Sequence, residues 1–416
     1  MSITAIKGMN DILPGTVETW QFLEQKAREV FGAYGYSEIR TPVVEKTELF
    51  CRSIGETTDI VEKEMYTFDD KSDNSLTLRP EGTAPVMRSF IQNRLHTLDP
   101  VSKLYYMGPM FRYERPQKGR YRQFHQIGAE VIGVEDAKID AQVLAMLHHY
   151  ACAIGIEAVE LQVNSLGCPE CRPDYRMVLI VYLEERLDSL CSECQRRYKT
   201  NPLRVLDCKS AGCKEATADA PSVLDHLCTG CEEHFAQVLG HLQSLEIPYS
   251  VNARMVRGLD YYVRTTFELV TDQLGSQNAV AAGGRYDGLV ESLGGPALPG
   301  IGFAIGLERL VLMKEASQAV AVRPDLFLAA MGDEATAQVF VLMSKLQRAG
   351  VRAEMDYMGK SLKAQMRRAN KLNARFTLII GEEELRTGNA ELKDMDQSRQ
   401  IQVALAGLEQ ELLNRL

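Results

Sequence analysis

The chain has 416 residues, of which 45% are hydrophobic and 25% charged, so we expect a soluble globular protein of two or three domains. Its net charge of −9 excludes nucleic-acid binding by overall charge, and its seven histidines are too few for a mechanism built on several of them. No apolar run could span a bilayer, and residues 1–10 lack the apolar centre of a signal peptide, so we expect a cytoplasmic protein.

Hydrophobic spacing in the first part of the chain predicts short strands and helices. Apolar residues at helical spacing predict a helix over 16–34, followed by a strand at 36–40. A hairpin tip at 67–74 precedes a strand that leads into a helix near Ala84. Further strands are predicted at 103–107, 126–132 and 160–164, and a helix at 137–154. This order is typical of an α+β domain with an antiparallel sheet.

The segment from Phe111 to Glu130 is rich in basic residues. They are Arg112, Arg115, Lys118, Arg120 and Arg122, and four aromatic residues lie among them. Arginine can bind phosphate oxygens through two parallel hydrogen bonds, and aromatic rings offer a flat surface to a base. Pro116 and Gly119 mark a turn, so we expect a strand, a basic loop and a strand. The segment alone fits either a nucleotide cradle or a solvated basic hairpin.

Residues 168–243 are predicted to be largely helical and to interrupt the sheet. Eight of the ten cysteines lie here, in the pairs Cys168/Cys171, Cys191/Cys194, Cys208/Cys213 and Cys228/Cys231. Paired thiolates at this spacing suit tetrahedral zinc, and disulfides are disfavoured in the cytoplasm. One or two structural zinc ions are one interpretation. The other is a metal-free helical segment whose cysteines are small apolar residues.

The sheet is predicted to resume after this insertion and to end at a linker, Arg323-Pro324. Its strands are expected at 249–252, 266–270 and 280–282, and residues 302–310 read as a strand feeding a helix. Beyond the linker, strands and helices alternate, with strands at 326–330, 352–355 and 376–380 and helices at 335–349, 362–372 and 408–416. This alternation predicts a compact α/β domain with a mostly parallel sheet.

Three further stretches place polar groups at strand ends or beside glycines. Residues 79–83 (RPEGT) present a carboxylate and a hydroxyl where a strand meets a helix, although a simple helix cap is also consistent. Residues 257–262 (RGLDYY) and 283–288 (GGRYDG) fit backbone close to a ligand or plain hairpin turns. Arg309 follows Gly306 at a helix start, where an anion or only solvent could lie. The chain has no P-loop and no GxGxxG in its required context, so arginines must serve any nucleotide.

Taken in order, these stretches resemble the class II aminoacyl-tRNA synthetases, and most closely the histidyl-tRNA synthetases. The resemblance runs from residues 7–11 (KGMND) through the C-terminal domain. Pro42 is similar to the proline of motif 1, residues 111–114 (FRYE) to motif 2, and residues 306–309 (GLER) to motif 3. Both histidine-specific signatures are recognisable, at 257–262 and 283–288.

The resemblance implies an α+β catalytic domain built on an antiparallel six-stranded class II synthetase sheet, in two parts at residues 1–167 and 246–322. Between them lies the cysteine-rich helical insertion, residues 168–245. Family members vary there, so the resemblance does not decide whether it binds zinc. Residues 324–416 would form an α/β anticodon-binding domain. A homodimer is implied, with motif 1 at its interface.

The resemblance also implies a ligase that uses ATP and Mg²⁺. Histidine and ATP would give histidyl-adenylate and pyrophosphate, and the acyl group would then pass to the 3′ end of the histidine tRNA. No protein nucleophile is needed, so catalysis would consist of positioning and electrostatic stabilisation. Arg112 and Arg257 would be the catalytic cations at the α-phosphate.

The family pattern assigns the remaining site residues in two groups. The residues for ATP would be Arg112, Glu114, Arg120, Phe124 and Arg309. The residues for histidine would be Glu81, Thr83, Gln126, Glu130, Arg257, Tyr262 and Tyr286. A neutral imidazole offers one donor and one acceptor, which Glu130 and Tyr262 would satisfy. The first three of the histidine group would bind the α-amino group.

The same pattern directs Arg115 and Gln117 toward the acceptor stem of the tRNA, which carries an extra 5′ guanosine. In the C-terminal domain, Arg367, Arg368 and Lys371 fit anticodon phosphate contacts or a solvated helix face equally well. A rival interpretation is a synthetase-like regulatory subunit that binds histidine without charging tRNA. Such proteins usually lack the anticodon domain and signature residues that this chain has. A sensor or RNA-binding domain derived from the fold would need no intact ATP site.

Overall fold

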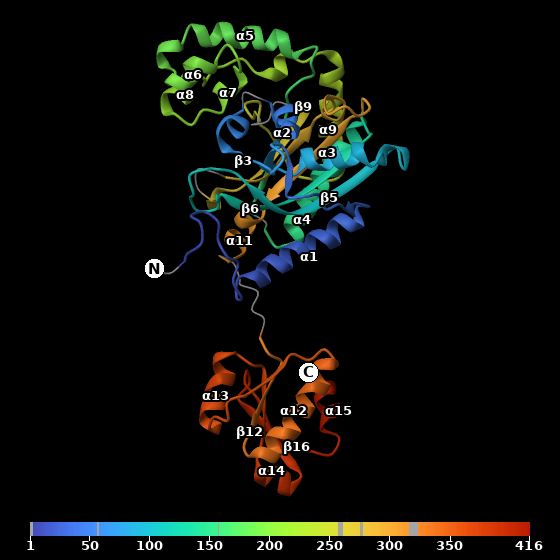
Figure 1. Ribbon diagram of the computed structural model, residues 1–416. Helices are drawn as coiled ribbons and strands as arrows, with labels where there is room; N and C mark the ends of the chain where they lie inside the picture. Colours follow the sequence, from blue (N-terminus) through green and yellow to red (C-terminus); the bar gives the residue numbers. More distant parts are fainter. Residues whose placement is uncertain (1–2, 56–57, 157, 257–260, 275–277, 316–322) are drawn as a thin grey trace. The chain divides into compact units, whose positions relative to one another are not determined.

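The computed structural model describes residues 3–55, 58–156, 158–256, 261–274, 278–315 and 323–416. The chain divides into two compact units, Met1–Val320 and Ala321–Leu416, each with its own hydrophobic core (Figure 1). Within these described ranges, no helix is long and apolar enough to cross a membrane.

An eight-stranded sheet forms the centre of the first unit, in the order β1-β5-β6-β11-β10-β9-β7-β8. Each inner strand runs antiparallel to its inner neighbours. The inner strands are β5 (Ser102–Phe111), β6 (Gln123–Ile132), β7 (Glu160–Ser165), β9 (Val263–Val270), β10 (Ala279–Arg285) and β11 (Gly300–Gly306). The edge strands β1 (Ser37–Glu38) and β8 (Ser250–Val251) pair in parallel with β5 and β7.

The prediction of a six-stranded antiparallel sheet is therefore wrong, because the sheet has eight strands and is mixed. Strands were expected near both edges, but a pairing of only two residues leaves no sequence signal for its direction. Parallel neighbours need a crossover connection, and helix α9 (Thr229–Ser244) is part of the one that joins β7 to β8. The expected strand, basic loop and strand at 111–130 is confirmed, since β5 ends at Phe111 and β6 begins at Gln123.

Alternate residues of the inner strands are buried on opposite faces of this sheet. Tyr105 of β5 belongs to a core shared with α1 (Val17–Ala33), α4 (Ala137–Ala153), α9 and α11 (Leu307–Glu315). The next residue, Tyr106, belongs to a second core with α3 (Thr83–Gln92) and α10 (Leu289–Ser292). The period of two therefore supports one layer of helices on each face of the sheet.

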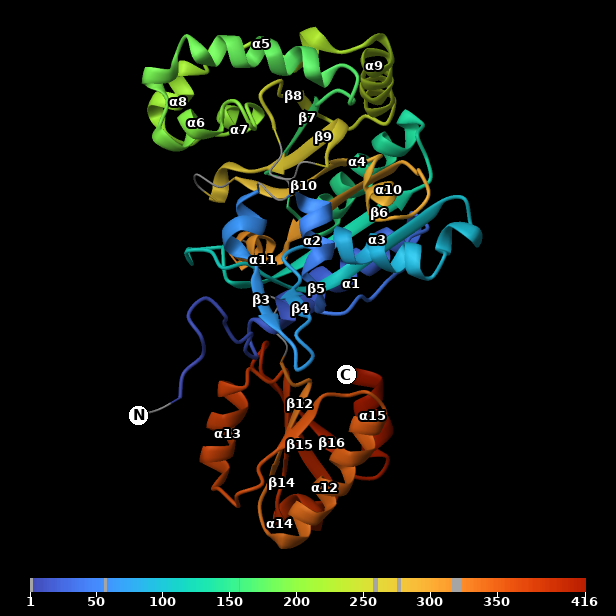
Figure 2. The same cartoon turned by 45° about the horizontal axis from the view of Figure 1, so that its top comes forward.

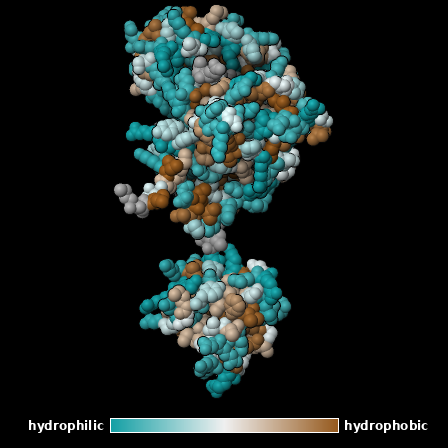
Figure 3. All heavy atoms as spheres, viewed as in Figure 1, coloured by the Kyte–Doolittle hydropathy of each residue, from teal (hydrophilic) through white to brown (hydrophobic). Residues whose placement is uncertain are grey.

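A separate three-stranded sheet lies beside α3. It contains β2 (Val44–Lys46), β4 (Ser75–Leu78) and β3 (Tyr66–Asp69), so the predicted hairpin at 67–74 is confirmed. Helix α2 (Thr47–Ile54), the π-helix η1 (Ile60–Glu64) and the 3-10 turn η2 (Leu95–Thr97) complete this region. Hydrophobic residues are exposed on the N-terminal segment, as Figure 3 shows, where Ile3, Ile6 and Leu13 are more than half exposed.

The cysteine-rich insertion is helical, as predicted. Figure 2 shows its helices grouped at one end of the unit. They are α5 (Arg172–Glu184), η3 (Leu187–Ser189), α6 (Ser192–Arg197), α7 (Leu203–Leu206), α8 (Ala211–Ala216) and η4 (Val223–His226). They enclose a small core that includes Leu179, Leu183, Val205 and two cysteines. Helix α9 packs instead on α4 and contributes Phe235, Val238 and Leu242 to the main core. Between β9 and β10 lies the short turn η5 (Asp272–Leu274).

The second unit is a five-stranded sheet with helices, in the order β13-β12-β14-β15-β16. The predicted parallel strands are present as β12 (Leu326–Ala330), β13 (Ala353–Met355) and β14 (Phe376–Ile380). The helices are α12 (Asp333–Arg348), α13 (Leu362–Lys371), α14 (Glu382–Thr387) and α15 (Leu408–Arg415). The sequence did not predict the antiparallel hairpin of β15 (Asn389–Asp394) and β16 (Arg399–Ala404). Four exposed residues open β16, so the hairpin lacks the alternation of buried and exposed residues that predicts a strand.

Candidate active site

A cavity of about 320 Å³ opens over the inner strands of the first unit. Of the residues that the sequence analysis assigns to a site, nine line this cavity: Glu81, Thr83, Arg112, Glu114, Arg120, Phe124, Gln126, Tyr262 and Arg309. They come from four separate parts of the chain. Strand pairing brings them together, because Gln126 of β6 lies opposite Gly306 of β11, the residue before the helix that carries Arg309.

One side of the cavity is cationic. The guanidinium of Arg112 donates from Nε to the carbonyl of Pro80 at 2.8 Å and lies over the ring of Phe124, 5.4 Å from its centroid. Arg120 forms an ion pair with Glu114, and Arg309 donates to the carbonyl of Ala279. Each side chain is thereby held at the cavity wall.

The positive charges of these arginines repel one another, and this repulsion indicates the kind of ligand that the wall suits. Burial lowers the pKa of Arg309, and the neighbouring charge of Arg120 lowers it further. Burial also lowers the pKa of Arg120, and the charge of Arg112 adds to that effect. Like charges gathered at a partly buried wall are costly without an anion between them. This wall is therefore suited to an anion with several oxygens, such as a polyphosphate.

A buried carboxyl group lies behind the part of the cavity wall that Thr83 forms. Glu130 is 1% exposed; Thr83 Oγ1 donates to its Oε1 at 2.7 Å and the Tyr286 hydroxyl donates to its Oε2 at 2.5 Å. Burial raises the pKa of Glu130 to about 8, although both hydrogen bonds act in the opposite direction. Glu130 and Tyr286 do not line the cavity itself but lie directly behind Thr83, which does.

Glu81 is also buried, and it caps helix α3. Its carboxylate accepts hydrogen bonds from the backbone N–H groups of Thr83 and Ala84, at 2.6 and 2.9 Å. Burial raises the pKa of Glu81, and these two hydrogen bonds oppose the shift. Residues 79–83 therefore do form a helix cap, as one of the two interpretations predicts. The capping carboxylate of Glu81 also lines the cavity.

The two signature segments contribute aromatic side chains. The rings of Tyr261 and Tyr262 lie 4.6 Å apart between centroids, and that of Tyr261 meets Tyr286 edge-on at 5.8 Å. Arg285, beside Tyr286, points away from the cavity. It is completely buried and pairs with Asp140 of α4 and with Asp287. Arg285 therefore anchors β10 to α4 and fixes the strand that carries Tyr286.

Several cavity residues escaped the sequence analysis. Glu268 of β9 and Tyr106 of β5 line the cavity, and Glu308 accepts hydrogen bonds from the backbone N–H of His125 at 2.8 and 3.1 Å. The ring of Tyr106 lies between Gly82 and Gly128, where a Cβ atom would approach it to 2.1 and 2.2 Å. The two glycines were the only sequence signal for the position of the Tyr106 ring. They could not be recognised as its neighbours from the sequence, because they become neighbours only through the fold.

Among the other assigned residues, one is not described by the structure and two are exposed on a loop. Arg257 is outside the described residues, so its assignment stays a prediction. Arg115 and Gln117 are exposed on the loop between β5 and β6, where Gln117 and Arg120 exchange backbone hydrogen bonds at 2.9 and 3.0 Å. In the second unit, Arg367 and Lys371 are exposed on α13, whereas Arg368 lies 3.8 Å from Asp356 and 4.0 Å from Glu354.

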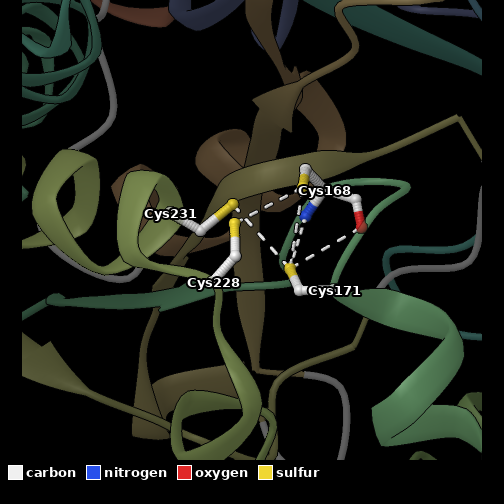
Figure 4. Close-up of side chains that lie close together, drawn as sticks. All are labelled: Cys168, Cys171, Cys228 and Cys231. Atoms are coloured by element: carbon white, nitrogen blue, oxygen red, sulfur yellow. Dashed lines mark hydrogen bonds between the residues drawn. The ribbon is translucent and has the colours of Figure 1, made fainter.

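The eight cysteines of the insertion form two clusters of four. One contains Cys168, Cys171, Cys228 and Cys231 (Figure 4), and the other contains Cys191, Cys194, Cys208 and Cys213. Within each cluster all four sulfur atoms lie within 4.8 Å of one another. Each cluster has two buried and two partly exposed members. The sequence could not give this grouping, because the first cluster combines the two outermost pairs, in which Cys168 and Cys228 lie 60 positions apart.

Comparison with known proteins covers both units. Residues 8–310 match the family model of histidyl-tRNA synthetase, and residues 325–415 match that of an anticodon binding domain. The chain is 73% identical to the histidine--tRNA ligase of Syntrophotalea carbinolica over 415 residues, covering 100% of this chain and 99% of the relative. It is 67% identical to that of Geobacter metallireducens, with 97% of each chain covered. The crystal structure of apo histidyl-tRNA synthetase from S. aureus superposes with a TM-score of 0.83 at 38% identity, covering 99% of this chain and 100% of that one.

Proposed function

The chain belongs to the histidyl-tRNA synthetase family of ligases, and we propose that its central cavity binds ATP and histidine side by side to form histidyl-adenylate. The histidyl group is then transferred to the 3′ end of the histidine tRNA. The observation that carries the proposal is that three arginines line one cavity together with Thr83, whose hydroxyl donates to the buried carboxyl group of Glu130 directly behind the wall.

The cationic wall is the proposed ATP site. Arg112, Arg120 and Arg309 would hold the phosphates, and their mutual repulsion makes a polyanion favourable there. Phe124 would stack on adenine and Glu114 would accept from its amino group. Because Glu114 is paired with Arg120, a nucleotide that uses both side chains must replace that ion pair. The resemblance adds Arg257 as a cation at the α-phosphate.

Mg²⁺ is the metal that the family uses with ATP. It prefers oxygen ligands and commonly binds through one or two carboxylates together with phosphate oxygens. Glu268 lines the cavity and lies within the electrostatic reach of Arg309, so its carboxylate fits such a role. When bound, the metal would share the charge of the phosphates with the arginines.

The histidine site is proposed around Glu130. Both oxygens of Glu130 receive hydrogen bonds, from Thr83 and Tyr286, so its carboxyl group is held in a fixed orientation. A fixed acceptor selects a ring with an N–H at one position and rejects similar residues that leave it unpaired. Tyr262 would meet the other ring nitrogen, and Glu81, Thr83 and Gln126 would bind the α-amino group.

The remaining assignments concern tRNA, assembly and location. We propose that Arg115 and Gln117 contact the acceptor stem, since both are exposed on the loop beside the cavity. The second unit would read the anticodon, with Arg367, Arg368 and Lys371 as candidate contacts.

We also propose a homodimer with Pro42 at its interface, supported by the exposed hydrophobic residues of the N-terminal segment. A cytoplasmic location follows from substrates that meet where proteins are made.

The proposed reaction predicts that the purified protein exchanges labelled pyrophosphate into ATP only when histidine is present. Exchange needs a reversible adenylation step and no tRNA, so it isolates the proposed cavity chemistry. A regulatory subunit that only bound histidine would give no exchange. Exchange that did not depend on histidine would equally reject the proposal, and glutamine serves as the amino-acid control.

A further inference from the structure

The two cysteine clusters have the dimensions of single-ion sites. Four sulfur atoms bound at about 2.3 Å to one zinc ion lie about 3.8 Å from one another. In the first cluster, Cys168 Sγ is 3.7 Å from the sulfurs of Cys171 and Cys228, and Cys171 Sγ is 3.9 Å from that of Cys231. In the second, the sulfurs of Cys191 and Cys208 are 3.8 Å apart. These distances are far longer than the ~2.05 Å of a disulfide.

We propose that the insertion binds two zinc ions, one in each cluster, and that the ion at its neck holds the histidine pocket in shape through Arg172. The neck site is the cluster of Cys168, Cys171, Cys228 and Cys231, and the distal site is that of Cys191, Cys194, Cys208 and Cys213. Each thiol gives up its proton as it binds the metal. The coupling to the pocket rests on the proposed function, whereas the metal sites do not.

The neck site joins the two ends of the insertion. Cys168 and Cys171 follow β7, whereas Cys228 and Cys231 begin α9, and Cys168 and Cys228 lie 60 positions apart in sequence. Figure 4 shows the four side chains converging from these two segments. Because α9 packs on α4, an ion here fixes the insertion to the main core at the point where the chain leaves and returns.

A short path leads from the neck site to the pocket. Arg172 directly follows Cys171, and its guanidinium donates to the carbonyls of Leu166 and Tyr262. Gly167 and Arg264 tie the same turn to β9, because Arg264 N–H donates to the carbonyl of Gly167 at 2.8 Å. Tyr262 lines the cavity, and its backbone carbonyl is thus held by the residue next to a proposed zinc ligand.

The distal site has a different task. Its four cysteines lie among helices of four to six residues, and two of them, Cys194 and Cys213, are part of the small core of the insertion. Small modules with short helices commonly need a structural metal to be stable. An ion here stabilises the module without touching the histidine pocket.

The first test measures the zinc content of protein purified without added metal by inductively coupled plasma mass spectrometry. Two zinc ions per chain are expected. The double variants Cys228→Ser/Cys231→Ser and Cys208→Ser/Cys213→Ser should each retain one. Replacement by Co²⁺ should give the visible absorption of tetrahedral thiolate sites. Less than one zinc per chain in the wild type, or iron in its place, would overturn the assignment.

The second test separates coupling from general damage by measuring KM for histidine and for ATP in pyrophosphate exchange. Arg172→Gln removes the link but no ligand, so it should keep both zinc ions and raise KM for histidine about fivefold, as expected for one hydrogen bond. The KM for ATP and kcat should change little. The neck double variant should raise KM for histidine at least as much.

The distal double variant and Arg176→Gln are the matched controls. Arg176 lies on the same helix as Arg172 but donates to the carbonyls of Lys199 and Thr200, inside the insertion. Both variants should leave KM for histidine unchanged. An unchanged KM in Arg172→Gln, or an equal rise for histidine and ATP, would reject the coupling. A wild type without any exchange would reject the proposed function, yet its zinc content would still decide the metal sites.

Discussion

At the scale of single residues, Glu130 is both the proposed contact of the histidine ring and a group with a shifted pKa. A carboxyl group placed where it can meet an imidazole must be buried to be selective, and burial is what raises its pKa to about 8. Folding therefore holds a proton on Glu130 that the unfolded chain would release at lower pH. The free energy of unfolding should fall as pH rises from about 4.5 toward 8, because in that window the folded state binds more protons than the unfolded state.

Glu130→Gln should remove this dependence, since the amide does not titrate. Relative to the wild type, the variant should gain stability between pH 5 and 8.5 by an amount of the order of a few kcal/mol. Calorimetry of the first unit at both pH values measures the difference. Glu291→Gln, at an exposed position, is the control and should shift the unfolding temperature equally at both. A parallel shift for Glu130→Gln would contradict the raised pKa.

At the scale of strands and helices, glycines give the pocket its shape. Gly302 of β11 lies opposite Glu130 of β6, and a Cβ atom on it would come within 1.7 Å of Glu130 Oε2 and 2.5 Å of the carbonyl of Ala129. The neighbouring strand must therefore lack a side chain at this position for Glu130 to be held there.

Gly302→Ala should displace the carboxyl group and lower the free energy of unfolding by about 1–3 kcal/mol, the usual cost of overpacking. Histidine-dependent exchange should fall with it. Gly288→Ala, in the signature segment 283–288, is the matched control, because nothing lies within 4 Å of its Cβ position and its φ is −92°. The measurements are the free energy of unfolding and the rate of pyrophosphate exchange for both variants. If Gly302→Ala behaved like Gly288→Ala in both, the position opposite Glu130 would not need to lack a side chain.

How far the sequence predicted this site depends on what each residue needs around it. Spacing and motif order brought Arg112, Gln126 and Arg309 into one hypothesis, and the strand pairing places them at one cavity. Tyr106 was missed because its place between two glycines depends on segments far apart in the chain. The grouping of the cysteines and the direction of two-residue edge strands are likewise long-range properties without a local signal.

At the scale of the whole molecule, the two units have independent cores. The cavity is lined entirely by residues of the first unit, and the second matches an anticodon binding domain. We therefore expect activation of the amino acid to depend on the first unit and recognition of the anticodon to depend on the second.

A chain that ends after the first unit should keep histidine-dependent pyrophosphate exchange within about twofold, because no cavity residue is lost. Its KM for tRNA in charging should rise by about tenfold or more, since one of two linked contacts is removed. Parallel exchange and charging assays measure both. If exchange were lost while the truncated protein kept its folded core by circular dichroism, the separation of the units would be wrong.

The position of the insertion also bears on the order in which the sheet can fold. Ser165 of β7 pairs with Thr265 of β9, so two adjacent strands are synthesised on opposite sides of the whole insertion. Pairing them requires closure of a long loop, and such closures slow folding. Metal bound at the neck would bring Cys171 and Cys231 together before β9 is made. The strand that follows would then meet its partner across a short distance, and the later half of the sheet could add to a preformed edge.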